Sequence, residues 1–108
     1  MSPTREDFAA EQKRLVAELL REHDELGNSY RVWSIDRMRI RGDTPDGLRW
    51  HGTVVRDYDD NLDLAWTGRL WQMGPKASDV KLLVRERRPD PVGALNAINA
   101  QLRERGWL

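Results

Sequence analysis

The segment Tyr30–Met73, YRVWSIDRMRIRGDTPDGLRWHGTVVRDYDDNLDLAWTGRLWQM, decides the fold of this 108-residue chain. It contains four of the five tryptophans, and its β-branched and aromatic residues favour strands. Gly42–Gly47 and Tyr58–Asn61 have the composition of loops. We therefore predict a meander of about four strands: Tyr30–Arg41, Leu48–Asp57, Leu62–Met73 and, after a loop at 74–78, Val80–Arg87.

Glycines and tryptophans suggest how the second and third predicted strands pair. A turn at Tyr58–Asn61 pairs Val54 with Leu64, Gly52 with Trp66, and Trp50 with Gly68. In this register each large ring covers a glycine on the neighbouring strand, which is a known way to pack a sheet surface. A slip by one residue would place apolar side chains on opposite faces. The alternative is a tight hairpin at Thr67-Gly68 that divides the third strand into two.

The same alternation assigns one face of the sheet to the core. With Ile40 opposite Leu48, the predicted inner face consists of Val32, Met38, Ile40, Leu48, Trp50, Val54, Leu64, Trp66 and Leu70. Asp36 also falls on this face, where an unpaired carboxylate would be costly to bury. A bulge between Ile35 and Met38 would turn it outward.

Helices are predicted on either side of the strands. Residues 5–26 carry an apolar stripe, with Thr4 as N-cap and Gly27 as the stop signal. The second helix begins at Pro91 after the N-cap Asp90 and ends at Gly106. In a Schellman ending there, Trp107 would contact Leu102. The stripe of the first helix is expected to cover the sheet; a coiled-coil seam is the alternative.

These elements predict one α+β domain over residues 1–108, with both helices on the same face of an antiparallel sheet. No segment has the roughly 20 apolar residues that span a bilayer, so we expect no membrane association. Met1–Ala10 holds two acidic residues and does not resemble a secretory signal, which favours a cytoplasmic location. Of the 18 basic residues, 15 are arginine, which hints at a GC-rich bacterial or phage genome.

The outer face of the predicted sheet is the candidate binding surface. Its residues are Trp33, Arg37, Arg39, Arg49, His51, Arg69 and Trp71, joined by Lys81, Arg85 and Arg87 if the fourth strand belongs to the sheet. In the predicted register Arg39, Arg49 and Arg69 form a row across three strands. Directly opposed like charges destabilise a sheet. The row therefore indicates either an anionic partner or acidic side chains folded over it from elsewhere in the chain.

No catalytic, metal or cofactor motif stands out. Asp57, Asp59, Asn61 and Asp63 resemble the start of a calcium loop, but Leu62 replaces its glycine and Gly68 its bidentate glutamate. A solvated turn is the favoured interpretation, with weak cation binding as the alternative. His23 and His51 lack the spacing of zinc ligands, and the chain has no cysteine. We predict neither a metal site nor a cofactor.

Three functional hypotheses follow. The first is a non-catalytic protein-interaction module (an adaptor, inhibitor or assembly protein) that binds a protein with an acidic surface, because arginine and tryptophan are enriched in interface hot spots. The second is a nucleic-acid-binding protein that uses the same basic face. The third is a small enzyme with a site between helix and sheet. The chain is expected to be a monomer or a homodimer.

Overall fold

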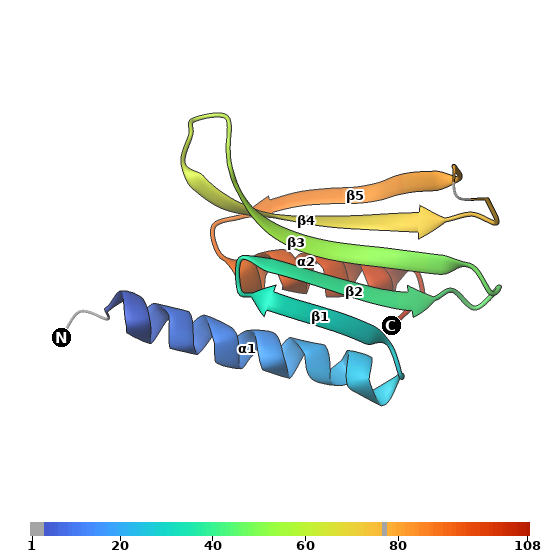
Figure 1. Ribbon diagram of the computed structural model, residues 1–108, viewed down its shortest axis with the longest axis horizontal. Helices are drawn as coiled ribbons and strands as arrows, with labels where there is room; N and C mark the ends of the chain where they lie inside the picture. The colour runs from blue at the N-terminus through green and yellow to red at the C-terminus, as the bar shows by residue number, and fades with distance from the viewer. Residues whose placement is uncertain (1–3, 77) are drawn as a thin grey trace.

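The computed structural model describes residues 4–76 and 78–108. The elements, in chain order, are α1 (Arg5–Glu25), β1 (Ser29–Ser34), β2 (Arg37–Asp43), β3 (Arg49–Tyr58), β4 (Leu64–Met73), β5 (Val80–Arg88) and α2 (Pro91–Glu104) (Figure 1). The strands form one antiparallel sheet in the order β1-β2-β3-β4-β5. The α+β class and the order helix, meander, helix are confirmed. Residues 1–3 of the segment tested as a signal, and Ala77 of the predicted loop, lie outside the described residues.

The sheet has five strands because the predicted strand Tyr30–Arg41 is a hairpin. Ser34 pairs with Arg37, so the chain reverses at Ile35 and Asp36. The Asp36 N–H donates to Ser34 Oγ at 3.2 Å, and the Asp36 carbonyl accepts from the Arg56 N–H at 2.9 Å. No Asn-Gly or Asp-Gly pair marks this turn, which is why the sequence reads as one strand.

β4 is a single strand, so the alternative hairpin at Thr67-Gly68 is wrong. The predicted register is also wrong: Val54 pairs with Gly68 instead of Leu64, and Ile40 pairs with Gly52 instead of Leu48. Each shift is four residues. Because side chains alternate with a period of two, an even shift leaves every residue on its predicted face. The assignment of faces therefore survives the wrong pairing.

The glycines have partners other than the predicted ones. The Trp50 ring covers Gly42, its neighbour on β2; a Cβ on Gly42 would meet the indole. Gly68 and Gly52 instead lie beneath α2. A Cβ on Gly68 would come 2.9 Å from the Ala94 carbonyl oxygen, so this glycine allows α2 to approach the sheet closely.

Both helices lie on the same side of the sheet, as predicted, and they also contact each other. In Figure 1, α2 lies behind the sheet and α1 runs beside β1. Thr4 caps α1 in a capping box with Asp7, and the Asp90 side chain caps α2 by accepting the Gly93 N–H at 2.6 Å. The predicted Schellman ending is present, since the Trp107 N–H donates to the Leu102 carbonyl at 2.8 Å.

The core lies between the sheet and the two helices. Its buried side chains include Met38, Ile40, Trp50, Val54 and Leu70 from the sheet, Leu95, Ile98 and Leu102 from α2, and Val16 and Leu20 from α1. The prediction is wrong for two core residues: Val32 on the edge strand and Leu64 at the hairpin end are 42% and 43% exposed. Leu48 precedes β3 and is half-buried. α2 does not extend over these positions.

Polar side chains join the two helices within this core. Gln12 Oε1 accepts the Val92 N–H at the start of α2, 3.2 Å away. His23 is fully buried, with Nε2 2.8 Å from Asn99 Oδ1 and Nδ1 3.1 Å from Asn28 Nδ2. Burial lowers the pKa of His23, so the neutral imidazole donates to Asn99 and accepts from Asn28. This network fixes the end of α1 against α2.

Across residues 4–76 and 78–108, neither helix combines the length and apolar character needed to cross a bilayer. Asp36, the residue whose burial was the weak point of the predicted inner face, lies in the β1–β2 turn. There its carboxylate accepts the Trp66 indole N–H at 3.0 Å and pairs with Arg56 at 3.4 Å.

Candidate interaction face

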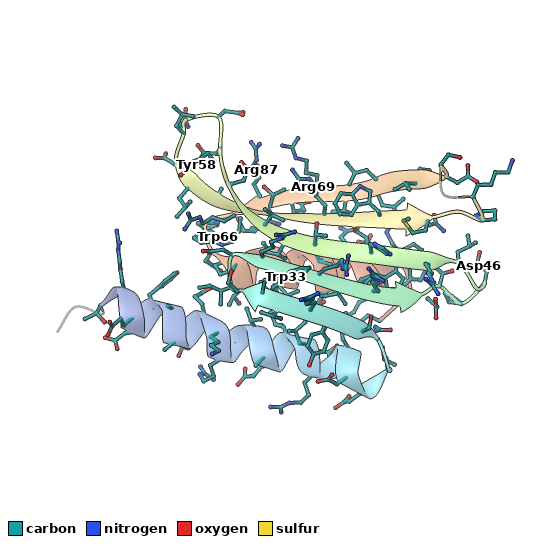
Figure 2. The ribbon with its side chains drawn as sticks, viewed as in Figure 1. Trp33, Asp46, Tyr58, Trp66, Arg69 and Arg87 are labelled. Carbon is teal, nitrogen blue, oxygen red and sulfur yellow. The ribbon has the colours of Figure 1, made fainter. Side chains whose placement is uncertain are left out.

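The face of the sheet opposite α2, called the outer face here, is left open by both helices. Figures 1 and 2 view the molecule from this side. One line of paired residues crosses all five strands: Arg31, Arg39, Thr53, Arg69 and Arg85. With neighbouring strands about 4.8 Å apart, this line spans about 19 Å. Four arginines thus form a row across the sheet, which we call the arginine row.

The predicted site residues share the outer face, but not all of them belong to the row. Arg39 and Arg69 do, whereas Arg49 does not: it pairs with Asp43 and Met73 at the end of the sheet. The four-residue error in register explains the difference. Arg37 lies two residues before Arg39 on β2, opposite Val55.

His51 and Trp71, two further predicted site residues, lie nearer the end of the sheet that holds Arg49. His51 pairs with Arg41 on one side and with Trp71 on the other. Lys81 was expected on the outer face but pairs with Gln72 on the opposite one. A bulge between Leu70 and Trp71 in the pairing with β5 causes this reversal.

Trp33 is the centre of an arginine cluster on this face. The guanidinium carbons of Arg37, Arg31 and Arg39 lie 4.7, 5.0 and 5.7 Å from the centroid of its ring. All three are within the range of cation–π attraction. The indole remains 41% exposed, so the cluster is a surface feature that holds one end of the arginine row in place.

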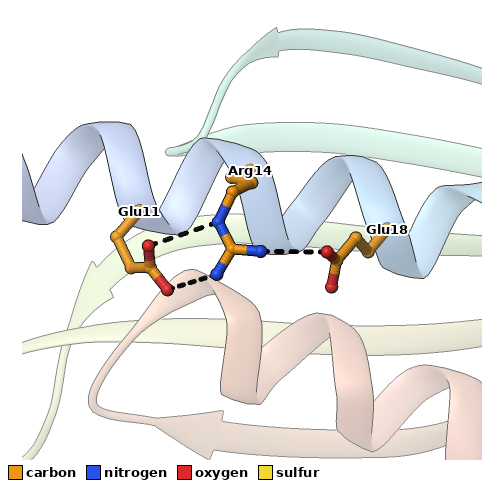
Figure 3. A network of polar contacts seen from close by, with 3 residues as sticks. All are labelled: Glu11, Arg14 and Glu18. Atoms are coloured by element: carbon orange, nitrogen blue, oxygen red, sulfur yellow. Dashed lines mark hydrogen bonds and ion pairs between the residues drawn. The ribbon is translucent and has the colours of Figure 1, made fainter.

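Acidic side chains do not neutralise the row. Among the described residues, no carboxylate lies within 4.0 Å of Arg31, Arg39, Arg69 or Arg85. Three acids of α1 instead pair with arginines of the helices. Arg14 bonds Glu11 and Glu18 on the exposed side of the helix, with closest N–O distances of 2.6 and 2.9 Å (Figure 3). Glu22 pairs with Arg103 of α2.

One acid forms an ion pair with an arginine of the outer face. Asp60, in the β3–β4 turn, lies 3.4 Å from Arg87, which pairs with Thr67 beside the row. Among residues 4–76 and 78–108, intramolecular acids therefore account for Arg87 and leave the four arginines of the row without ion-pair partners.

The surrounding arginines also affect His51. Burial lowers its pKa most, and the charges of Arg41, Arg39 and Arg49 lower it further. Positive charge thus converges on this histidine from β2 and from its own strand, and it disfavours protonation of the ring. The neutral imidazole can donate and accept hydrogen bonds, while the arginines can only donate.

Several buried polar atoms on the outer face have no partner. Within the described residues these are Arg41 Nε, Thr53 Oγ1, Thr67 Oγ1 and Arg87 Nε, all on residues of this face. Buried polar atoms are normally satisfied by protein, by ordered water or by a ligand. Four of the five such atoms in the described part of the chain thus lie on the outer face, and the fifth, Trp50 Nε1, lies on the inner face.

An apolar corner adjoins the charged part of the face. Trp71 pairs with Leu82, and Met73 pairs with Val80. Leu82 and Val80 are 48% and 47% exposed, and Trp71 and Met73 are half-buried. The outer face thus combines a positive row with a contiguous apolar patch.

Two arginines of the outer face were not among the predicted site residues: Arg31 and Arg41. Arg85 was predicted on this face on condition that the fourth strand belongs to the sheet. Arg31 and Arg41 share the alternation of Arg37 and Arg39, which was the available signal. Their importance depends on the β1–β2 hairpin, which the sequence does not mark. Arg85 enters the row only because β5 pairs with β4.

The aspartates that resemble a calcium loop serve as a turn. Asp59 Oδ1 accepts the N–H groups of Asn61 and Asp63 at 2.8 and 3.0 Å. Leu62 there has φ +62°. In the part of the chain that the structure describes, no three His, Asp or Glu side chains gather as potential metal ligands.

Comparison of the chain with protein-family models, with curated proteins and with solved structures gives no match. What the outer face can do is therefore inferred from its own residues.

Proposed function

We propose that this protein is a non-catalytic protein-interaction module whose outer face binds an acidic segment of a partner protein. The observation that carries the proposal is the arginine row: four arginines opposed across strands without a carboxylate to offset them. Such an arrangement costs stability, and an acidic partner would offset that cost.

The Trp33 cluster and the apolar corner favour a protein partner. Arg31, Arg37 and Arg39 are already held against Trp33, so little conformational freedom remains to be lost on binding. Leu82 and Val80 offer exposed apolar surface beside the row. A peptide with carboxylates followed by apolar side chains complements both parts of the face, and tryptophan with arginine is typical of binding hot spots.

Nucleic acid is the second candidate, because the same row could contact phosphates. Base stacking requires a free aromatic face, however, and three guanidiniums surround the Trp33 ring. The chain has no net charge, which also weakens polyanion binding. The acidic-peptide proposal is therefore preferred.

The test is a fluorescence-anisotropy titration with three labelled probes: an acidic peptide ending in apolar residues, poly-glutamate, and oligonucleotides in single- and double-stranded form. At about 50 mM salt we expect the mixed peptide to bind most tightly, and binding to weaken at about 200 mM. The double variant Arg39→Glu with Arg69→Glu should lower its affinity at least about tenfold.

The matched control is Lys13→Glu with Arg21→Glu, which makes the same charge change at exposed positions of α1. It should leave the affinity for the mixed peptide nearly unchanged. Tighter binding of an oligonucleotide with a steep salt dependence would replace the proposal with nucleic-acid recognition. The absence of binding to every probe, or equal losses in both double variants, would refute a role for the outer face.

A further inference from the structure

An open pocket of about 450 Å³ lies at the end of the sheet, where α1 ends and the chain leaves α2. Its polar and aromatic lining consists of Asn28, Ser29, Arg41, Asp43, Arg49 and Trp107. The C-terminus, the end of α1 and the start of β1 lie together at this end of the molecule (Figure 1). The volume falls within the range of small-molecule sites.

The walls of the pocket are fixed by two similar helix endings. Gly27 and Gly106 have φ of +75° and +74°, and each turns the chain out of its helix. The N–H of the following residue, Asn28 or Trp107, then donates to a carbonyl of the last turn at 2.9 or 2.8 Å. The Asn28 side-chain amide is hydrogen-bonded to His23. The guanidinium carbon of Arg105 lies 5.5 Å from the centroid of the Trp107 ring. The site is therefore preorganised.

The charge of the pocket is positive. It holds two arginines and one carboxylate, that of Asp43. The Asp43 carboxylate forms no ion pair within 4.0 Å with either guanidinium, although Asp43 and Arg49 are partners in the strand pairing. Arg41 Nε is buried and has no acceptor among the described residues. Arg49 is exposed and likewise has no carboxylate partner in the described chain. A buried N–H donor without an acceptor, next to a second guanidinium, is suited to an oxyanion.

We propose that this pocket binds a small molecule that joins an oxyanion, a carboxylate or a phosphate, to a flat apolar group. Arg41 and Arg49 bind the oxyanion, and the flat group packs on Trp107. The Asn28 side chain adds polar contacts at the α1 wall, while Asp43 disfavours ligands with several negative charges. The site is separate from the peptide-binding role of the outer face, since Arg69, Arg85 and the Trp33 cluster do not line it.

The test is a ¹⁵N–¹H NMR titration of the full chain with benzoate, phenyl phosphate and inorganic phosphate. Either aromatic anion should shift the Arg41 Nε–H and Trp107 indole signals saturably below about 10 mM, and the tighter of the two identifies the oxyanion. Inorganic phosphate should bind about tenfold more weakly than phenyl phosphate, because it lacks the group that packs on Trp107.

Arg49→Gln is the test variant, since its exposed side chain can change without loss of fold. It should weaken binding about tenfold, whereas Arg69→Gln, which removes the same charge outside the pocket, should not. No saturable shift, equal affinity for phosphate and phenyl phosphate, or equal losses in both variants would each overturn the proposal. These outcomes leave the peptide test unaffected, because that test leaves Arg49 unchanged.

Discussion

The two faces of the sheet are built on opposite principles. On the inner face, Trp50, Leu70 and Val54 are almost completely buried against the helices. On the outer face, Arg39 opposes Arg31, and Arg69 opposes Arg85, with no acid to separate them. Burial of apolar area stabilises the fold, and repulsion between opposed arginines lowers its stability. The arginine row on the outer face therefore opposes the stability that burial on the inner face provides.

The tryptophans show the difference most directly, and they give the largest expected effect. Trp50 is fully buried, and its ring packs against Gly42, whereas Trp33 is 41% exposed among arginines. Trp50→Ala should lower the free energy of unfolding by about 3–5 kcal/mol through loss of burial and a cavity. Trp33→Ala should cost about 1 kcal/mol, the scale of exposed cation–π contacts.

Urea unfolding of both variants measures this comparison. Because Trp33 belongs to the proposed binding cluster, Trp33→Ala should also weaken binding of the acidic peptide while the fold remains intact. Similar losses of stability in the two variants would mean that the outer tryptophan is part of the core, and the contrast between the faces would then fail.

The sequence predicted the faces better than the pairings. Helix caps and stop signals placed α1 and α2 because Thr4, Asp90, Gly27 and Gly106 act locally. The register between β3 and β4 depends on the turn at 59–63 and on the packing of α2 against Gly68. The alternation of side chains along a strand predicts neither of these features. The face assignment survived because the error was an even number of residues.

The candidate site was predictable to the same degree. Arg39 and Arg69 share the outer face in any even register, so alternation alone placed them together. The full row could not be foreseen, because Arg31 joins through an unmarked two-residue turn and Arg85 joins through the order of the sheet. Lys81 was misplaced because a bulge in the β4–β5 pairing has no signal in the sequence.

The two histidines make the stability of the fold depend on pH. We expect an effect smaller than that of the Trp50 substitution and larger than that of the Arg85 substitution. Burial is the main cause that lowers the pKa of His23 between the helices, and of His51 on the outer face, below the ordinary value of about 6.5. The unfolded chain then binds more protons than the folded one below about pH 6.5. Stability is therefore complete above that pH and falls as the pH decreases toward the folded-state values.

NMR titration of the two imidazoles at low and high salt separates the causes. The pKa of His51 should rise with salt, since charges of Arg41, Arg39 and Arg49 contribute to its shift and are screened. The pKa of His23 should respond less, because burial dominates there.

In urea unfolding at pH 7.5 and 5.5, His23→Gln and His51→Gln should each reduce the loss of stability on acidification. An unchanged loss in both variants would assign it to other groups.

The smallest expected effect is the most specific to the outer face. Arg85→Glu places a carboxylate opposite Arg69, so a repulsive cross-strand pair becomes attractive. The free energy of unfolding should rise by about 0.2–1 kcal/mol, and Arg85→Gln should give a smaller rise. High salt should reduce both gains, because exposed charges are screened.

The same variant should bind the acidic peptide less tightly, since it removes one of the four arginines and adds a negative charge. A variant that is more stable and binds less well is the pattern expected where residues are arranged for binding at a cost in stability. Destabilisation by Arg85→Glu would show instead that the guanidinium holds β5 to the sheet. The arginine row would then have a structural role, and both faces of the sheet would contribute to the stability of the fold.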